Sequence, residues 1–463
     1  MTLESTRRRA LVQIGALGLC GLSLPRVLQA AVEQPRNVPR VQSVILVYLD
    51  GGPSHIDLFD MRPQATAEVR GPFRPMATSV PGTQVCEHLP GMAAQMHRIL
   101  QVRSVRHEET VHDPAVYQML TGYKHLSSAG DLKVEPTDHP HMAAAFSQAD
   151  GVPVVMPRAM QTPDLMRMGG RLLPGQNGGI LSPAFQPILV PVSRDGHVQP
   201  PNFRGAEQLT RERLMGRTRL VEQFNAELAE LERVGQSGRL DSFRQQALDI
   251  VSSPHAQRAF DLDLEPAATR ERYGRHRHGQ AVLLARRLVE AGTRFVTVYW
   301  GNEEQDWADG RGKQLANNPW DTHRNHFPLT KESLCPRADQ TLSALIEDLA
   351  QRGLLESTLV VWMGDFGRTP TISKPWASRD HWPHAFTILL AGGGTRGGEV
   401  YGRTDKQAAE VVDKPVSPAD ITATLFAALG VDPASAIATA AGKLHRLSSG
   451  KVVSEWFGRP LGS

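Results

Sequence analysis

"VQSVILVYLDGG", residues 41–52, is the stretch that decides the fold. Ser43 to Leu49 is almost entirely apolar and rich in β-branched side chains, and the run ends in Asp-Gly-Gly. A short apolar run without alternating polar residues is typical of a strand that is buried on both faces, as in a parallel sheet. The stretch therefore predicts a central strand with Asp50 at its carboxyl end.

Four later stretches repeat this pattern. They are "RILQVRSV" (98–105), "RFVTVYW" (294–300), "STLVVWMGD" (357–365) and "AFTILLAGGG" (385–394). The helical patterns "HLPGMAAQMHRI", "PAVYQMLTG" and "DQTLSALIEDLAQRG" lie between several of them. Strands that alternate with helices predict an α/β fold with a mainly parallel sheet.

Two other segments affect the domain assignment. Residues 206–292 contain long, charged, amphipathic segments, which predict a helical insertion between the early and late strands. "GGGTRGG" (392–398) has the G-x-G-x-x-G spacing of a dinucleotide-binding loop. Because "EVYGRTD" follows instead of a helix, we interpret it as a glycine-rich turn.

The N-terminus predicts export. "STRRRALVQIGALGLCGLSLPRVLQAA" has paired arginines, an apolar core and small residues near Ala30, so residues 1–30 are typical of a twin-arginine signal peptide. A transmembrane anchor is the weaker alternative, because glycines and Pro25 interrupt a run that is short for a span. We expect a linker at 31–40, a folded domain at 41–463, export by the twin-arginine machinery to the periplasm or medium, and no stable membrane span after signal removal.

The overall composition and charge argue against one class of function, nucleic-acid binding. The chain has 463 residues, of which 40% are hydrophobic and 21% charged, as in ordinary soluble proteins. The net charge of +3 is too small to indicate nucleic-acid binding, and no such motif is present. Loss of the signal would remove Cys20 and leave Cys86 and Cys335, whose pairing the sequence leaves open.

Carboxylates and imidazoles gather near every predicted strand end, where ligands bind in α/β sheets. The residues are Asp50, Ser54, His55 and Asp57; His107, Glu108, Glu109, His112 and Asp113; Asp321, His323 and His326; Asp365 and Arg368; and Asp380, His381 and His384. Each residue alone is weak evidence for a functional site, because an Asp before Gly-Gly is often only a turn residue. Together they would carry a large uncompensated charge, which divalent cations such as Zn²⁺ or Mn²⁺ offset. Two metals about 4 Å apart could polarise a phosphoryl or sulfuryl oxygen.

Several motifs carry a family resemblance. "LVVWMGDFG" and "DHWPHAFTILLAGGG" are similar to segments of the alkaline phosphatase and sulfatase superfamily. "GGPSHIDLFD", "WDTH", "GDFGRTP" and "RDHWP" resemble a bacterial family, domain of unknown function 1501. The resemblance implies an alkaline-phosphatase-like three-layer αβα sandwich and divalent metal ions, one or two, of which Zn, Mn, Ca and Mg are not distinguished. It implies Asp50 and Asp365 as ligands of one metal and Asp321 and His323 as ligands of the other. His381 would join one of them, and His326 is an alternative to His323.

This chain departs from the superfamily at two places. Phe366 stands where the superfamily has a histidine or asparagine, so one ligand is missing or comes from His55 or Asp380. "HDPAVYQMLTG" (112–122) resembles the sulfatase signature Cys-x-Pro-Ser-Arg followed by Leu-Thr-Gly, with His112 at the position of the modified cysteine. A formylglycine sulfatase is thereby excluded, whereas a histidine can be a nucleophile or a metal ligand.

The helix that this stretch predicts is capped by Asp113 and ends at Gly122. His112 would then lie at its positive end, where anions bind.

Two functions follow as hypotheses. The first is an exported metal-dependent hydrolase or transferase that acts on phosphate or sulfate esters, small anionic molecules or saccharide esters. In it His112 is catalytic or a ligand, and Arg368 clamps the anion. The second is a secreted binding or assembly protein that keeps the fold without turnover, because a retained fold does not guarantee a retained reaction.

Overall fold

The structure is a computed structural model that describes residues 41–152, 154, 156–199, 254–301, 303–306, 313–316, 318–374, 377–459 and 461. The predicted signal peptide (1–30), the linker (31–40) and residues 206–253 of the predicted insertion lie outside the described residues.

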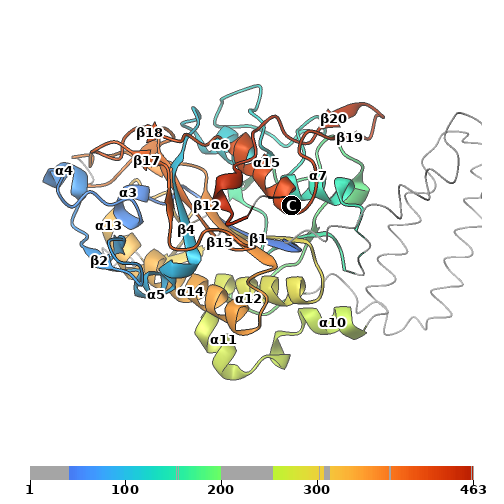
Figure 1. Cartoon of the computed structure of the whole chain (residues 1–463), viewed down its shortest axis with the longest axis horizontal. Coiled ribbons are helices and arrows are strands. Elements are labelled where there is room, and N and C mark those ends of the chain that lie inside the picture. The colour runs from blue at the N-terminus through green and yellow to red at the C-terminus, as the bar shows by residue number, and fades with distance from the viewer. Residues whose placement is uncertain are drawn as a thin grey trace, which may run out of the picture.

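An eight-stranded sheet forms the centre of the molecule (Figure 1). Its strands, in spatial order, are β16 (Val400–Tyr401), β4 (Ile99–Val105), β15 (Phe386–Gly392), β12 (Thr358–Gly364), β1 (Ser43–Leu49), β9 (Phe295–Trp300), β5 (Ala159–Thr162) and β8 (Ile188–Leu189). The five longest are the five strands predicted from sequence, and the three short ones were not predicted.

Strand β1 is buried on both faces, as its apolar run predicts. It pairs in parallel with β12 on one side and with β9 on the other. Ile45, Val47 and Leu49 belong to one hydrophobic cluster. Val44, Leu46 and Tyr48 belong to the cluster on the opposite face. Because side chains of a strand alternate between faces, one seven-residue run joins both halves of the core.

The sheet is mainly parallel, which confirms the predicted fold class. β15 is the exception among its strands, since it pairs antiparallel with both β12 and β4. Consequently the residues that precede β15 lie at the sheet edge where the parallel strands end. This direction places His381 beside the residues that follow β1, β4 and β12.

Helices cover both faces, so the architecture is the predicted three-layer αβα sandwich. Figure 1 shows α12 and α14 below the sheet and α6 and α15 above it. The lower layer contains α5 (Pro90–Gln95), α10 (Pro254–Phe260), α11 (Ala267–Tyr273), α12 (Arg277–Glu290) and α14 (Cys335–Gln351). The upper layer contains α6 (His112–Thr121), α7 (Met142–Ala149) and α15 (Pro418–Ala428). Since α12 packs on the core, this part of residues 206–292 belongs to the sandwich itself.

Short elements complete the described fold. They are α3 (His55–Leu58), α4 (Ala67–Arg70) and α13 (His326–Leu329), and the strand pairs β2 (Pro75–Ala77) with β3 (Gln84–Cys86), β6 (Arg167–Met168) with β7 (Arg171–Leu172), β10 (Glu303–Asp306) with β11 (Lys313–Ala316), β13 (Gly367–Arg368) with β14 (His381–Trp382), β17 (Arg403–Thr404) with β18 (Val411–Asp413), and β19 (Ala436–Ala438) with β20 (Leu444–Arg446).

Helix α6 corrects one expectation. It begins at His112 itself, and the residue before it, Val111, offers no side-chain cap. The prediction that Asp113 caps the helix is therefore wrong. Its carboxylate instead lies 2.5 Å from Arg171, so an ion pair replaces the cap. The predicted end is confirmed, because Gly122 adopts the left-handed conformation.

Two further features bear on the sequence analysis. Cys86 and Cys335 are both free thiols, and both are buried in the same hydrophobic cluster. In the described part of the chain, no helix has the length and apolar character needed to cross a membrane.

Candidate functional site

Two buried carboxylates mark the carboxyl ends of the central strands. Asp50 follows β1 and Asp365 follows β12, and the last pair of these parallel strands is Leu49 with Gly364. Both side chains are fully buried. Asn318 Nδ2 donates to Asp50 Oδ1 at 2.8 Å, whereas Asp50 Oδ2 and Asp365 Oδ1 have no hydrogen-bond partner among the described residues. Unpaired buried oxygens are costly, so their environment favours a cation.

The Asp-Gly-Gly turn brings a third carboxylate to this edge. Gly51 has φ +112°, and a Cβ at this position would lie 2.2 Å from the amide nitrogen of Asp321. The Trp320 amide donates to the carbonyl of Asp50 at 3.0 Å. Because only glycine permits this approach, the turn after β1 fixes the backbone of Asp321 against the strand end.

His112 lies between two of the carboxylates. Its Nδ1 contacts Asp365 Oδ2, and its Nε2 lies 3.3 Å from Asp321 Oδ2. Burial alone would lower the pKa of His112, but Asp365 and Asp321 raise it to about 10. Without a metal, His112 is therefore an imidazolium that neutralises part of the buried negative charge.

The pKa values of Asp50 and Asp321 are shifted in opposite directions. Burial and the neighbouring charge of Asp365 raise the pKa of Asp50 well above its usual value. Burial would also raise the pKa of Asp321, but hydrogen bonds from His112 and other histidines, and the charge of Arg368, hold it far below. Asp321 is thus the carboxylate on which the positive charge of the site converges.

Two more histidines face Asp321 Oδ1. His323 Nε2 lies 3.0 Å from this oxygen and His381 Nε2 lies 3.2 Å from it. Within the described residues, His112, Asp321 and His381 form the one group whose ligand atoms all lie within 4.8 Å of each other and could hold a metal ion. His323 adjoins this group, with its Nε2 2.8 Å from His381 Nε2.

Acceptors behind the rings fix how these histidines present their nitrogens. His381 Nδ1 lies 2.7 Å from the Thr110 carbonyl, which can only accept, so Nδ1 carries the proton. His323 Nδ1 lies 2.7 Å from Asp380 Oδ1. Burial lowers the pKa of His381, whereas the hydrogen bond to Asp321 raises that of His323. With the proton on Nδ1, the neutral form of His381 keeps the Nε2 lone pair for a metal ion, as metal-binding histidines do.

Exposure is graded across the site. Side-chain exposure rises from 4% at His112 through 25% at Asp321 to 38% at His323. The pair Asp50 and Asp365 forms the floor. A ligand can therefore reach the site from the Asp321 and His323 side.

Arg368 is fully buried and bonded within the protein. Its guanidinium donates to Asp321 Oδ1 at 2.8 Å, to the Gly52 carbonyl at 2.9 Å and to the Trp320 carbonyl at 3.0 Å, and it also contacts the Gly51 carbonyl. These contacts hold the turn and orient Asp321. The predicted anion clamp stays a prediction, and the contacts favour a positioning role.

The alternative ligands have other partners: His55 and Asp380 were alternatives for the missing ligand, and His326 was the alternative to His323. The ring of Phe366 packs 4.9 Å from His112 and 4.4 Å from His381, centroid to centroid. His55 Nε2 lies 2.8 Å from the Ala408 carbonyl, and His326 Nε2 lies 2.8 Å from Asp57. Asp380 supports the ring of His323. Among the described residues, the group that could hold a metal ion is thus smaller than the predicted set.

Sequence reasoning missed Asn318, the Thr110 carbonyl and Arg379. An isolated Asn in a loop and a backbone carbonyl have no sequence signature. Arg379, however, lies in the quoted motif "RDHWP".

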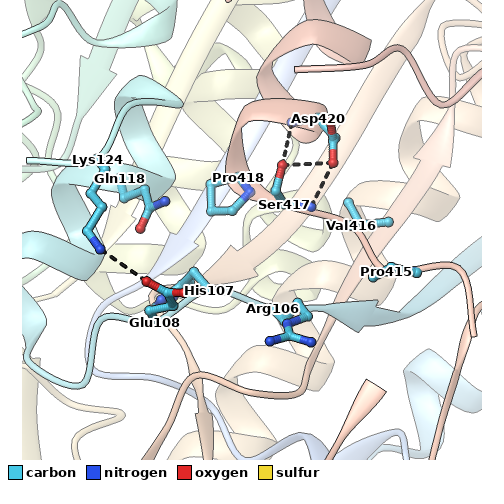
Figure 2. A pocket seen from close by; sticks show the side chains of 10 residues that line it. All are labelled: Arg106, His107, Glu108, Gln118, Lys124, Pro415, Val416, Ser417, Pro418 and Asp420. Carbon is cyan, nitrogen blue, oxygen red and sulfur yellow. Dashed lines mark hydrogen bonds and ion pairs between the residues drawn. The ribbon is translucent and has the colours of Figure 1, made fainter. Parts of the chain in front are cut away.

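A cavity of about 470 Å³ adjoins the site on the far side of the segment after β4. Figure 2 shows Arg106 and His107 from this segment, Gln118 from α6 and Pro418 from α15 around it. His107 Nε2 lies 2.6 Å from the backbone carbonyl of Asp365. The cavity wall and the floor of the site therefore share this histidine.

Comparison with known proteins places the chain in a family. No curated protein matches it in sequence. It is similar in structure to a phosphonate monoester hydrolase from Silicibacter pomeroyi, with a TM-score of 0.40, 13% identity and coverage of 89% of this chain and 75% of that one. A sulfatase from Pseudoalteromonas sp. gives a TM-score of 0.38 and 13% identity, covering 88% of this chain and 70% of that one. A mutant of the alkaline phosphatase PafA gives a TM-score of 0.41 and 10% identity, covering 91% and 100%.

Because one fold hosts many activities, this similarity leaves the reaction open. The family match, by contrast, spans the whole described sandwich. Residues 41–457 match the description "Protein of unknown function (DUF1501)", the family that the four motifs predict. The chain therefore belongs to the DUF1501 family.

Proposed function

We propose that this chain is an exported, metal-dependent hydrolase or transferase of phosphate or sulfate esters. One observation carries the proposal: His112, Asp321 and His381, from three separate segments, bring their ligand atoms within 4.8 Å of each other. Two buried carboxylates with unpaired oxygens lie behind them. Mixed histidine and carboxylate ligation suits Zn²⁺ or Mn²⁺.

The chemistry of the donors fits a cation. In the metal-bound protein, His112 would donate Nδ1–H to Asp365 and present Nε2, and His381 would donate Nδ1–H to Thr110 and present Nε2. Such second partners are usual for ligand histidines. When bound, a divalent cation would stabilise charge on a phosphoryl or sulfuryl oxygen and acidify water. Asp50 and Asp365 remain the proposed ligands of a second ion.

The surrounding residues set the direction of approach. Asp321 and His323 are the most exposed members of the site, so the anionic ester enters on their side. His323 is placed to hold or move a proton at Nε2, because Asp380 fixes its Nδ1. Asp365 holds Nδ1 of His112, whereas its buried Nε2 has no hydrogen-bond partner among the described residues and lies 3.3 Å from Asp321, which favours the role of His112 as a ligand.

Metal analysis tests the proposal. The purified wild-type protein should contain at least one equivalent of divalent metal. Asp321→Ala and His381→Ala should lose that metal, whereas His197→Ala, whose ring is exposed, should retain it. A wild-type protein without metal after chelator-free purification would overturn the proposal.

A second candidate is a binding protein without turnover. The observation that supports it is the position of Phe366. Its ring packs against His112 and His381, and an apolar ring cannot be a metal ligand. The two candidates differ on a panel of phosphate and sulfate esters. If the metal-loaded protein turns over an ester, Asp50→Ala, His112→Ala and Asp365→Ala should each abolish the activity. A loaded protein that turns over none favours the second candidate.

A further inference from the structure

A second polar cluster lies beneath the site, centred on Asp57. Asp57 Oδ2 accepts hydrogen bonds from Ser54 Oγ at 2.5 Å, from His326 Nε2 at 2.8 Å and from Arg379 Nε at 2.7 Å. Asp57 Oδ1 accepts from Arg379 Nη2 at 2.9 Å. All four side chains are buried. We call Ser54, Asp57, His326 and Arg379 the Asp57 hub.

Each partner of Asp57 comes from a segment that also carries a site residue. Ser54 follows Asp50, His326 follows His323, and Arg379 precedes His381. The hub therefore joins three loops that are far apart in sequence.

Further bonds extend the hub along these loops. Thr322 Oγ1 lies 2.5 Å from His326 Nδ1, and Ser378 Oγ donates to the Thr322 carbonyl at 2.5 Å. Arg379 Nη1 donates to the Thr369 carbonyl at 2.9 Å, next to Arg368. The residues on both sides of the metal-binding group are thus fixed by side-chain bonds.

The hub stands in place of secondary structure in the loop that carries Asp321 and His323. Residues 321–325 lie in neither a helix nor a strand. Without a backbone ladder, a loop keeps one conformation only if packing and side-chain bonds hold it. Burial would raise the pKa of Asp57, but Arg379 and His326 lower it, so Asp57 stays a carboxylate. Because breaking a buried ion pair is costly, the arrangement of the loops is stiff.

We propose that the Asp57 hub is a positioning element that holds Asp321, His323 and His381 in the geometry a metal ion requires. The inference rests on the proposed function, in which Asp321 and His381 hold a metal together with His112, and His323 adjoins them. The hub residues themselves bind no ligand, because their polar atoms are bonded to one another and buried. Removal of such supporting bonds elsewhere typically weakens metal binding tenfold to a hundredfold.

The test compares variants of one hub position with a matched control. His326→Leu removes both bonds of the ring at similar volume, and His326→Gln keeps a donor for Asp57. Tyr273→Phe is the control, because it removes a 2.9 Å hydroxyl bond to the buried carboxylate of Asp348, which pairs with Arg286. Ser54→Ala makes the corresponding change in the hub. The readouts are Zn²⁺ affinity by chelator competition, the unfolding midpoint, and hydrogen exchange of residues 320–326 and 378–382 in the metal-free protein.

The expected results distinguish a positioning role of the hub from a general contribution to the stability of the fold. His326→Leu should weaken Zn²⁺ binding by roughly tenfold to a hundredfold and speed exchange in both loops. His326→Gln should recover most of the affinity, and Ser54→Ala should lose part of it. Tyr273→Phe should lower the midpoint and leave Zn²⁺ affinity and loop exchange unchanged.

Two negative results have different meanings. If the wild-type protein binds Zn²⁺ and His326→Leu binds it equally well with unchanged exchange, the positioning role is wrong and the proposed function stands. If the wild-type protein binds no metal, the proposed function fails and this inference fails with it.

Discussion

At the scale of single residues, Gly51 shows how closely the backbone and the site are linked. Its positive φ and the short approach of Asp321 both require the absence of a side chain. The sequence shows only Asp-Gly-Gly after a strand, which many turns share. What makes this glycine a site residue is the loop that packs on it, and that loop lies far along the chain.

Replacing Gly51 should therefore cost more than replacing an ordinary turn glycine. Gly51→Ala should lower the free energy of unfolding by about 3–5 kcal/mol, because strain and overlap with the Asp321 backbone add. Gly353→Ala is the control, since it has φ +70° and no atom within 4 Å of the new Cβ. It should lose about 1–2 kcal/mol from strain alone. Urea unfolding measures both, and equal losses would show that the Asp321 approach does not constrain Gly51.

The residue types of the candidate site could be predicted from the sequence, but their contacts could not. Asp50, Asp365 and His381 were expected because each adjoins an apolar strand. The structure brings them to one edge of the sheet. The pairing of His112 with two carboxylates depends on where α6 begins, which differs from the prediction. The hydrogen-bond partners of the rings, such as the Thr110 carbonyl, carry no sequence signal.

At the scale of elements, strand direction decides where His381 lies. The apolar run at 385–394 predicts a strand but not its direction, because the pattern does not distinguish parallel from antiparallel pairing. Antiparallel pairing with β12 puts the residues before β15 at the edge where the parallel strands end. A parallel β15 would have carried His381 to the opposite edge, so this direction is necessary for the site.

Helix α7 carries an acid-sensitive cap. His141 is fully buried at its N-terminus, and its Nδ1 accepts from the Ala143 amide at 2.9 Å. Burial lowers the pKa of His141 to about 3. An unfolded histidine titrates near 6.5. The stabilisation from the neutral ring is therefore complete above about pH 6.5 and is lost as the pH falls from there toward 3, at roughly 1.4 kcal/mol per pH unit.

Replacing His141 with asparagine should make the free energy of unfolding depend less on pH below neutrality. Asn is a good helix cap and does not titrate. Between pH 8 and pH 5, the free energy of unfolding of His141→Asn should therefore fall by about 2 kcal/mol less than that of the wild-type protein. At pH 8 the variant should be less stable by about 1–2 kcal/mol through lost packing. Ser182→Asn, which exchanges a cap without titration, should leave the slope unchanged. Parallel curves for His141→Asn and wild type would contradict the prediction.

At the scale of the whole molecule, the five longest strands and the alternation of elements were enough to predict an α/β fold with a mainly parallel sheet, whereas the three-layer sandwich came from the family resemblance. Strands of two to four residues, such as β5, β8 and β16, were not found, because so few residues show no periodicity. The sheet direction and the two core clusters follow from pairing between distant segments, which a single sequence does not record. The carboxyl-end edge is the place where these long-range pairings and the polar residues coincide.

The last prediction concerns how metal binding and the stability of the whole fold are coupled. The site joins segments that follow β1, β4, β9 and β12 and that precede β15, so unfolding of the sheet separates its ligands. An ion that binds only the folded chain adds stability by mass action, about 2.7 kcal/mol when free Zn²⁺ exceeds its dissociation constant a hundredfold. Urea unfolding of the wild-type protein should show this increment with Zn²⁺ and its loss with a chelator. Asp321→Ala should show no increment, whereas Tyr273→Phe should keep it in full. An increment that persists in Asp321→Ala would mean that the stabilising ion binds outside the group formed by His112, Asp321 and His381.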